Sequence, residues 1–104
     1  MKNKYNLIIL PIAKNDMENI IFYVSKIIKN NSSAIKISKS FEKGLNIILK
    51  FPYGNPIYNI NQKNKKEYRC LKIKNYLMFY FINNNNIIIA RVLYSKMNIE
   101  YYID

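Results

Sequence analysis

The sequence contains no histidine and a single cysteine, Cys70, among its 104 residues. One cysteine cannot form an intramolecular disulfide, and a chain without histidine lacks the commonest ligands of a zinc site. The same absences exclude the Ser-His-Asp and Cys-His groups of many hydrolases. Only six residues are acidic and they are scattered, so a pair of catalytic carboxylates is not expected. We therefore expect no metal and no cofactor, and any catalysis has to use Lys, Arg, Tyr or Glu.

Glycine and proline are also scarce, with two and three copies. This excludes collagen-like and flexible-linker chains, and a chain that is 50% hydrophobic and 14% aromatic is not disordered. No apolar run approaches the roughly 20 residues of a membrane-spanning helix. The apolar stretch Leu7–Ala13 imitates a signal peptide, but Pro11 interrupts it, so we predict a strand there. We expect one cytoplasmic domain over residues 1–104, with no membrane partner.

The sequence has an excess of positive charge. It contains 17 Lys and Arg residues and six Asp and Glu residues, which give a formal net charge of +11. The stretch Lys50–Lys74 alone carries seven of these cations and one anion, Glu67. Such a balance suits anionic partners, namely nucleic acids, anionic membrane surfaces or acidic proteins. A codon bias toward Lys and Asn explains the excess equally well, so charge alone does not select a partner.

Two segments have the apolar spacing of amphipathic helices. The first begins near Pro11, a residue suited to the first turn of a helix, and continues to Ile28. Its buried face is predicted to consist of Ala13, Met17, Ile20, Ile21, Val24, Ile27 and Ile28. A polar Asn-Asn-Ser-Ser sequence then interrupts the pattern, and Ser32 or Ser33 is expected to cap a second helix over residues 34–48. So short a connection predicts an antiparallel helical hairpin.

The remaining patterns are those of strands. Four strands are predicted, at Tyr5–Leu10, Tyr68–Ile73, Tyr76–Ile82 and Ile87–Tyr94. The last three are joined by tight turns and so form an antiparallel meander, whereas the lysine-rich loop up to Lys66 and the tail at 95–104 show no regular pattern. The order β-α-α-β-β-β predicts an α+β fold, an antiparallel sheet with the helical hairpin packed on one face. We expect the other sheet face to be concave, basic and open.

Several polar residues of this sheet have ordinary structural explanations. Alternation places Arg69, Leu71 and Ile73 on one face of their strand and Tyr68, Cys70 and Lys72 on the other. Arg69 and Arg91 are expected to form ion pairs or lie at the surface, Tyr94 to pack on the sheet, and Cys70 to be a small buried residue. None of these residues taken singly indicates a function.

The motifs taken in series resemble one family. Ala13 with Asp16-Met17 is similar to an A-x-x-D-L helix start, and Phe51-Pro52 with Gly54 is similar to an F-P-x-G segment. Residues 68–80 resemble a Y-R-x-L-x-V-x-N-Y-L-I-F-Y hairpin, and residues 87–96 resemble the closing strand V-x-I-x-R-V-L-H-x-R. In this order and spacing they resemble the RelE/ParE superfamily of toxins from bacterial type II toxin–antitoxin systems, over nearly the whole chain.

The resemblance implies a protein partner and two alternative modes of action. The partner is a cognate acidic antitoxin, whose C-terminal segment wraps around the toxin, and a basic, partly apolar groove suits such a segment. ParE-like members act on DNA gyrase, whereas RelE-like members enter the ribosomal A site and cleave mRNA. Fold alone does not choose between them. A third and less favoured hypothesis is a basic nucleic-acid-binding domain without toxicity.

The resemblance also assigns candidate site residues. In a RelE-like ribonuclease, which needs no metal, the catalytic residues implied here are Arg69, Lys96 and Tyr101. The arginine that such enzymes carry inside the next strand corresponds to Leu77, so the set is depleted. This departure favours ParE-like action on gyrase, in which a binding surface replaces an active site. The residues expected to bind the target or nucleic acid are Lys72, Lys74, Arg91 and Tyr94.

Overall fold

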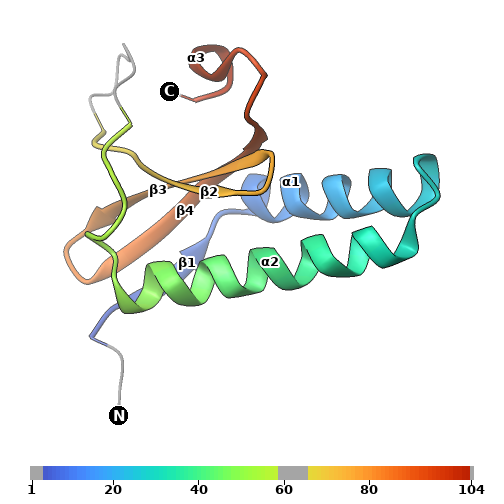
Figure 1. Ribbon diagram of the computed structural model, residues 1–104. Coiled ribbons are helices and arrows are strands. Elements are labelled where there is room, and N and C mark those ends of the chain that lie inside the picture. Colours follow the sequence, from blue (N-terminus) through green and yellow to red (C-terminus); the bar gives the residue numbers. More distant parts are fainter. Residues whose placement is uncertain (1–3, 59–65, 104) are drawn as a thin grey trace.

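The computed structural model describes residues 4–58 and 66–103. Its elements are, in chain order, β1 (Asn6–Ile9), α1 (Pro11–Phe22), the π-helical segment η1 (Tyr23–Ile27), α2 (Asn31–Lys50), β2 (Arg69–Ile73), β3 (Tyr76–Asn83), β4 (Asn86–Tyr94) and α3 (Ile99–Tyr102). Figure 1 shows α1 and α2 side by side along one face of the sheet and α3 on the opposite side. The predicted α+β fold is confirmed, while the expected lysine-rich loop falls mostly on residues 59–65, outside the described residues.

The sheet has four strands in the order β1-β4-β3-β2, which leaves β2 at one edge. β2, β3 and β4 form the predicted antiparallel meander. β1 runs parallel to β4, with Asn6 opposite Asn86, so the sheet is mixed rather than antiparallel throughout. The pairing shifts between Phe79 and Tyr80, which makes Ala90 the extra residue of a β-bulge in β4.

The two long helices form the predicted antiparallel hairpin, and Pro11 is the first residue of α1. The cap of α2 differs from the prediction, because Ser32 and Ser33 already lie inside the helix. Asn30 is the cap, and its side-chain oxygen accepts a hydrogen bond of 3.0 Å from the backbone N–H of Ser33. An asparagine therefore satisfies one of the free N–H groups at the start of α2.

The end of the first helix also departs from the predicted pattern. At η1 the backbone N–H of Ile28 donates to the carbonyl of Tyr23 at 3.0 Å, a hydrogen bond across five residues. This wider turn rotates the side chains that follow it away from the ideal helical phase. Ile27 and Ile28, which the sequence assigned to the buried face, are consequently 60% and 54% exposed.

The sheet face toward α1 and α2 holds the larger of two apolar clusters. The thirteen buried residues of this helix-face cluster are Ala13, Met17, Val24, Ala34, Ile37, Phe41, Ile48, Ile73, Met78, Tyr80, Ile87, Ile89 and Val92. Gly44 allows α2 to approach β2 closely, because a Cβ atom at this position would lie 2.5 Å from the Cδ1 atom of Ile73. The hairpin is therefore closely packed on the sheet.

The opposite sheet face is covered by the chain itself, so the prediction of an open face is wrong. Its tail-face cluster consists of the buried residues Tyr68, Cys70, Phe79, Ala90, Leu93, Ile99 and Ile103. Ile99 and Ile103 come from α3 and the residue after it, and their spacing of four places both on one side of a helical turn. A helix of four residues is too short to produce a recognisable period in the sequence, which is why the tail looked unstructured.

Candidate functional site

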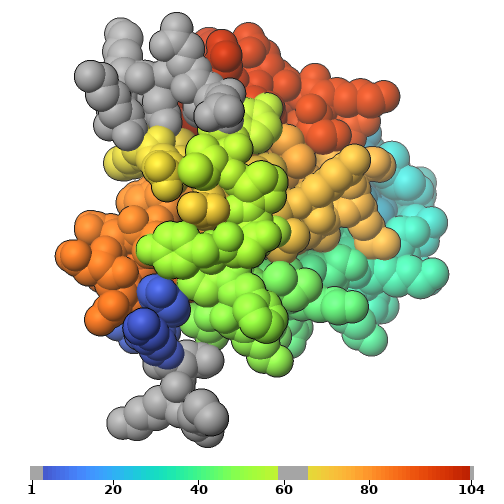
Figure 2. Space-filling view, turned by 60° about the vertical axis from the view of Figure 1, so that its left-hand side comes forward, coloured from blue at the N-terminus to red at the C-terminus, as the bar shows by residue number. Residues whose placement is uncertain are grey.

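Arg69 fastens the segment after α2 to the sheet. Its Nη1 atom donates hydrogen bonds to the carbonyl of Asn55 at 2.7 Å and to that of Tyr53 at 3.5 Å. The guanidinium also lies 5.0 Å from the ring centre of Tyr53, and Nη2 is 3.7 Å from the carboxylate of Glu67. Figure 2 shows this yellow-green segment crossing the surface beside the strands. Arg69 thus uses much of its donor capacity within the fold.

Tyr80 of β3 also anchors the segment after α2, through hydrogen bonds of its hydroxyl group. Its hydroxyl donates to the carbonyl of Pro52 at 2.7 Å and accepts from the side-chain amide of Asn55 at 3.2 Å. Burial raises the pKa of Tyr80, although the hydrogen bond from Asn55 and the charge of Arg69 act in the other direction. An open hollow of about 300 Å³ lies beside Arg69. Its lining residues are Tyr53, Lys66, Glu67, Arg69, Phe81, Ile82 and Asn83.

Arg91 forms a short, bidentate ion pair with Asp16. Its Nε and Nη2 atoms donate to the two carboxylate oxygens of Asp16 at 2.8 and 2.9 Å, and the backbone N–H of Val92 donates to the same group at 3.0 Å. The Nη1 atom reaches the carbonyl of Tyr102 at 3.3 Å. Arg91 therefore joins α1, β4 and α3, in agreement with the expected ion pair for this arginine.

Lys72 and Lys74 lie at the edge of the sheet. Together with Lys43 of α2 they line a hollow of about 190 Å³ over Gly44. Lys74 adopts a left-handed backbone conformation, with φ 53°, in the tight turn between β2 and β3. The three lysines give this edge a concentrated positive charge that suits an anionic partner.

Tyr94 lines a third hollow, which has a volume of about 500 Å³ and is larger than the two described above. Its lining residues are Asn19, Ile20, Tyr23, Tyr76 and Tyr94, which come from α1, η1 and the adjacent ends of β3 and β4. Burial raises the pKa of the Tyr76 hydroxyl, and the neighbouring Tyr94 and Tyr23 raise it further. Of these tyrosines, the sequence marks Tyr94 as a candidate binding residue and Tyr76, like Tyr94, as a residue that packs on the sheet, whereas Tyr23 joins them from a distant part of the chain.

The three residues implied for a ribonuclease are placed apart. Arg69 and Ile73 are at opposite ends of β2, about 13 Å apart at roughly 3.3 Å per residue. Lys96 follows β4 beside the Ile73 end, because the N–H of Ser95 donates to the carbonyl of Asn75 at 2.8 Å. Tyr101 is in α3 on the far face of the sheet and is 79% exposed. Leu77, at the position of the missing arginine, packs against the tail-face cluster.

The free end of the helical hairpin carries an apolar surface that sequence reasoning missed. Phe22, Ile27, Ile28 and Ile35 are each more than half exposed, and we call these four residues the hairpin-tip patch. A hollow of about 410 Å³ adjoins them, lined by Ile21, Ser25, Asn31, Ala34, Ile35 and Ser38. Exposed apolar side chains mark an interaction site where they form one continuous surface. The signal in the sequence is an apolar pattern wider than one helix face needs.

The architecture is that of a small α+β protein with several open hollows and exposed apolar side chains at its surface. The described residues contain no group of three or more His, Cys, Asp or Glu side chains placed to hold a metal ion. No helix in the described part of the chain has the length and apolar character needed to cross a membrane.

Comparison with known proteins assigns the family. The sequence matches the family model of the ParE toxin of type II toxin-antitoxin system, parDE, over residues 7–99, so the chain belongs to the ParE toxin family. A solved structure titled "Chromosomal ParDE TA system from P. aeruginosa" is similar in fold, with a TM-score of 0.70 and 14% sequence identity, over 91% of this chain and 100% of that chain. The comparison with curated proteins found no match.

Family membership confirms the predicted toxin of a type II toxin–antitoxin system, and such a toxin has a cognate antitoxin as its partner. It also fits the ParE-like hypothesis better than the RelE-like alternative.

Proposed function

We propose that this toxin arrests growth by binding DNA gyrase and that it does not cut mRNA. The observation that carries the proposal is the placement of Arg69, which is held by the carbonyls of Asn55 and Tyr53 at the end of β2 remote from Lys96. A ribonuclease needs a base, a cation and a proton donor around one phosphate. Membership of the ParE family supports the same target. Gyrase acts on the chromosome, so the proposal implies action in the cytoplasm.

The test uses the purified full chain in two assays. We expect it to inhibit supercoiling of a relaxed plasmid by gyrase and to trap gyrase on cleaved DNA. In a reconstituted translation reaction, we expect mRNA on ribosomes to remain intact. Ribosome-dependent cleavage of mRNA without an effect on gyrase would overturn the proposal, and salt-sensitive binding to bare nucleic acid without either effect would favour the non-toxic hypothesis.

Two conservative variants separate the mechanisms in cells. Lys96→Gln and Tyr101→Phe each remove a group that a ribonuclease would use, and both positions are outside the buried clusters. On the gyrase proposal, growth arrest by each variant equals that of the unchanged chain. Loss of arrest in either variant, with the protein soluble and folded by circular dichroism, contradicts the proposal.

We also propose that the acidic antitoxin covers the hairpin-tip patch. The patch consists of four exposed apolar side chains, and Lys26, Lys29 and Lys36 lie next to it in the chain, so an amphipathic segment with acidic flanks is complementary to it. Ile35→Glu places a negative charge inside the patch, whereas Asn46→Glu adds the same charge farther along α2. We expect the first variant, and not the second, to lose neutralisation and co-purification when the neighbouring acidic gene product is co-expressed.

A further inference from the structure

The tyrosine-lined hollow between η1 and the sheet is not explained by the toxin fold or by the gyrase proposal. We propose that Tyr23, Tyr76 and Tyr94 form a stacking site for one unpaired base of a single-stranded nucleic acid, whose phosphates lie on neighbouring lysines. The hollow has a volume of about 500 Å³, which is large enough for a nucleobase and its sugar. It lies on the sheet side of η1 and shares no lining residue with the hollow at the hairpin tip.

Ring contacts hold Tyr76 and Tyr94, and stacking surface remains free at the site. Tyr76 is packed edge-on against Phe41, with ring centres 5.9 Å apart, and against Tyr94 at 6.0 Å. These contacts fix the position of the central ring. Tyr23 and Tyr94 keep 53% and 41% of their surface exposed. An unpaired base stacks on such rings whatever its identity, because every base has an aromatic face.

Backbone geometry provides a second, independent observation. Tyr23 is the first residue of η1, and the π-helical conformation accounts for well under 1% of residues in proteins. It interrupts the regular hydrogen bonding of an α-helix and is frequently found at functional sites. Here the wide turn occurs where a helix passes the hollow, with Asn19, Ile20 and Tyr23 all facing it. The side-chain amide of Asn19 offers both a donor and an acceptor to the edge of a base.

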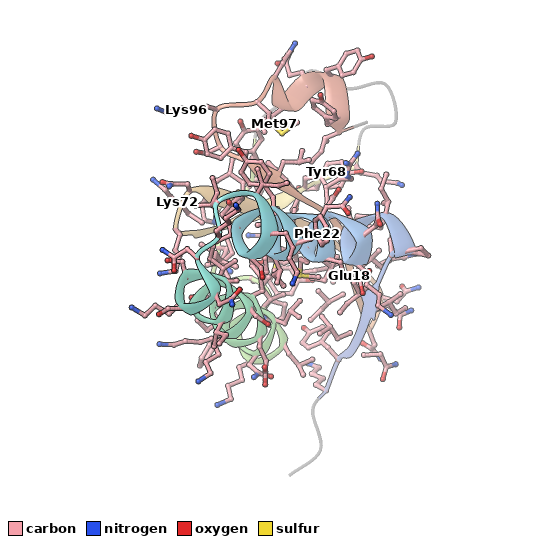
Figure 3. All side chains as sticks on the ribbon, turned by 90° about the vertical axis from the view of Figure 1, so that its right-hand side faces the viewer. Glu18, Phe22, Tyr68, Lys72, Lys96 and Met97 are labelled. Atoms are coloured by element: carbon pink, nitrogen blue, oxygen red, sulfur yellow. The ribbon has the colours of Figure 1, made fainter. Side chains whose placement is uncertain are left out.

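The charges near the hollow favour an anionic ligand. Tyr76 and Tyr94 are directly paired neighbours in the sheet, and the turn that holds Lys74 is hydrogen-bonded to Ser95, which precedes Lys96. The two lysines therefore border the same end of the sheet as the tyrosines. Figure 3 shows Lys72 and Lys96 on one side of α1 and Glu18 on the other. None of the described residues that line the hollow is acidic.

The experiment measures binding of a fluorescein-labelled 12-nucleotide oligo-dT by anisotropy, with the full chain, at several salt concentrations. We expect Tyr94→Ala to weaken binding about tenfold, because one stacking ring is lost, while Tyr94→Phe keeps the affinity. Phe51→Ala is the matched control, since it removes an aromatic ring that is 65% exposed at the far end of α2. Lys96→Gln should reduce the magnitude of the slope of log affinity against log salt by about 0.7, the contribution of one phosphate contact to a single strand.

Three outcomes overturn the proposal. Equal affinities for Tyr94→Ala and Phe51→Ala would show that the ring does not stack on the ligand. Equal affinity for an abasic oligonucleotide of the same length would show that only phosphates are bound. Binding of a polyglutamate peptide that depends on Tyr94, with oligo-dT binding unaffected, would assign the hollow to an acidic protein.

Discussion

The two faces of the sheet are covered in different ways. The helix face is covered by α1, η1 and α2, and its cluster contains thirteen buried residues. The tail face is covered mainly by α3, a helix of four residues, and its cluster contains seven. Because hydrophobic stabilisation grows with the area buried, the two covers differ in strength. We therefore expect the tail-face layer to open more readily than the helix-face layer.

The largest effect is expected on the helix face. Phe41 is 2% exposed and packs edge-on against Tyr76. Phe41→Ala leaves a cavity under α2 and should lower the free energy of unfolding by about 3–5 kcal/mol. Urea denaturation followed by circular dichroism measures this loss. A loss below about 1 kcal/mol would mean that the helix face is not the stronger of the two layers.

The next effect concerns two ion pairs that differ in burial and in hydrogen bonding. Asp16 receives three hydrogen bonds and its side chain is 12% exposed, whereas Glu67 is 66% exposed and 3.7 Å from Arg69. Asp16→Ala leaves Arg91 and the N–H of Val92 without their acceptor and should cost about 2–3 kcal/mol. Glu67→Ala should cost about 0–1 kcal/mol. Urea denaturation measures the free energy of unfolding of both variants. Similar losses would show that the partly buried ion pair does not contribute more to stability than the exposed one.

The sequence predicted the helix face well because its signals are local and repeated. Apolar residues at helical spacing, such as Ala34, Ile37 and Phe41, predict the buried face of a helix, and the structure confirms that these residues are buried. Alternation in β2 likewise separated Leu71 and Ile73 from Cys70, and the two sets belong to different clusters.

The tail face could not be predicted in the same way, because its signals are either short or distant in sequence. Ile99 and Ile103 make only one repeat, and Asp16 meets Arg91 across 75 residues of chain. Nothing in the local sequence marks the π-helical turn that exposes Ile27 and Ile28. The candidate surfaces depend on contacts between distant residues and on the π-helical turn, so they could be identified only from the folded structure.

A smaller effect is expected where α2 approaches the sheet most closely. Gly44→Ala favours the helix by about 1 kcal/mol, because alanine is the better helix former. The new Cβ atom would lie 2.5 Å from Cδ1 of Ile73 and 3.3 Å from Cδ2 of Leu71, so these side chains must move at an expected cost of about 1–3 kcal/mol. We expect a net loss of about 0–2 kcal/mol by thermal or urea unfolding. A clear gain in stability would show that the packing at Gly44 is looser than described.

The smallest expected effect concerns the reactivity of the Cys70 thiol. Cys70 is buried in the tail-face cluster, so its reactivity measures how readily the tail face opens. Burial raises the pKa of Cys70 to about 11, so at pH 8 the folded chain holds little of the thiolate that reacts with disulfide reagents. The pKa is higher in the folded than in the unfolded chain, so the thiol disfavours folding only as pH rises above about 9. If the tail opens separately, labelling of Cys70 at pH 8 in low urea will depend only weakly on urea, because little surface is exposed.

Matched variants decide whether labelling follows the tail or the whole fold. Ile103 is 3% exposed on the tail face and Ile48 is fully buried on the helix face, and alanine at either position removes a similar apolar side chain. Ile103→Ala weakens the tail cover, so it should accelerate labelling in low urea. Ile48→Ala weakens the hairpin and should lower global stability, yet it should leave that labelling rate nearly unchanged. Equal acceleration by both variants would mean that Cys70 becomes reactive only on global unfolding, and that the two faces of the sheet open together.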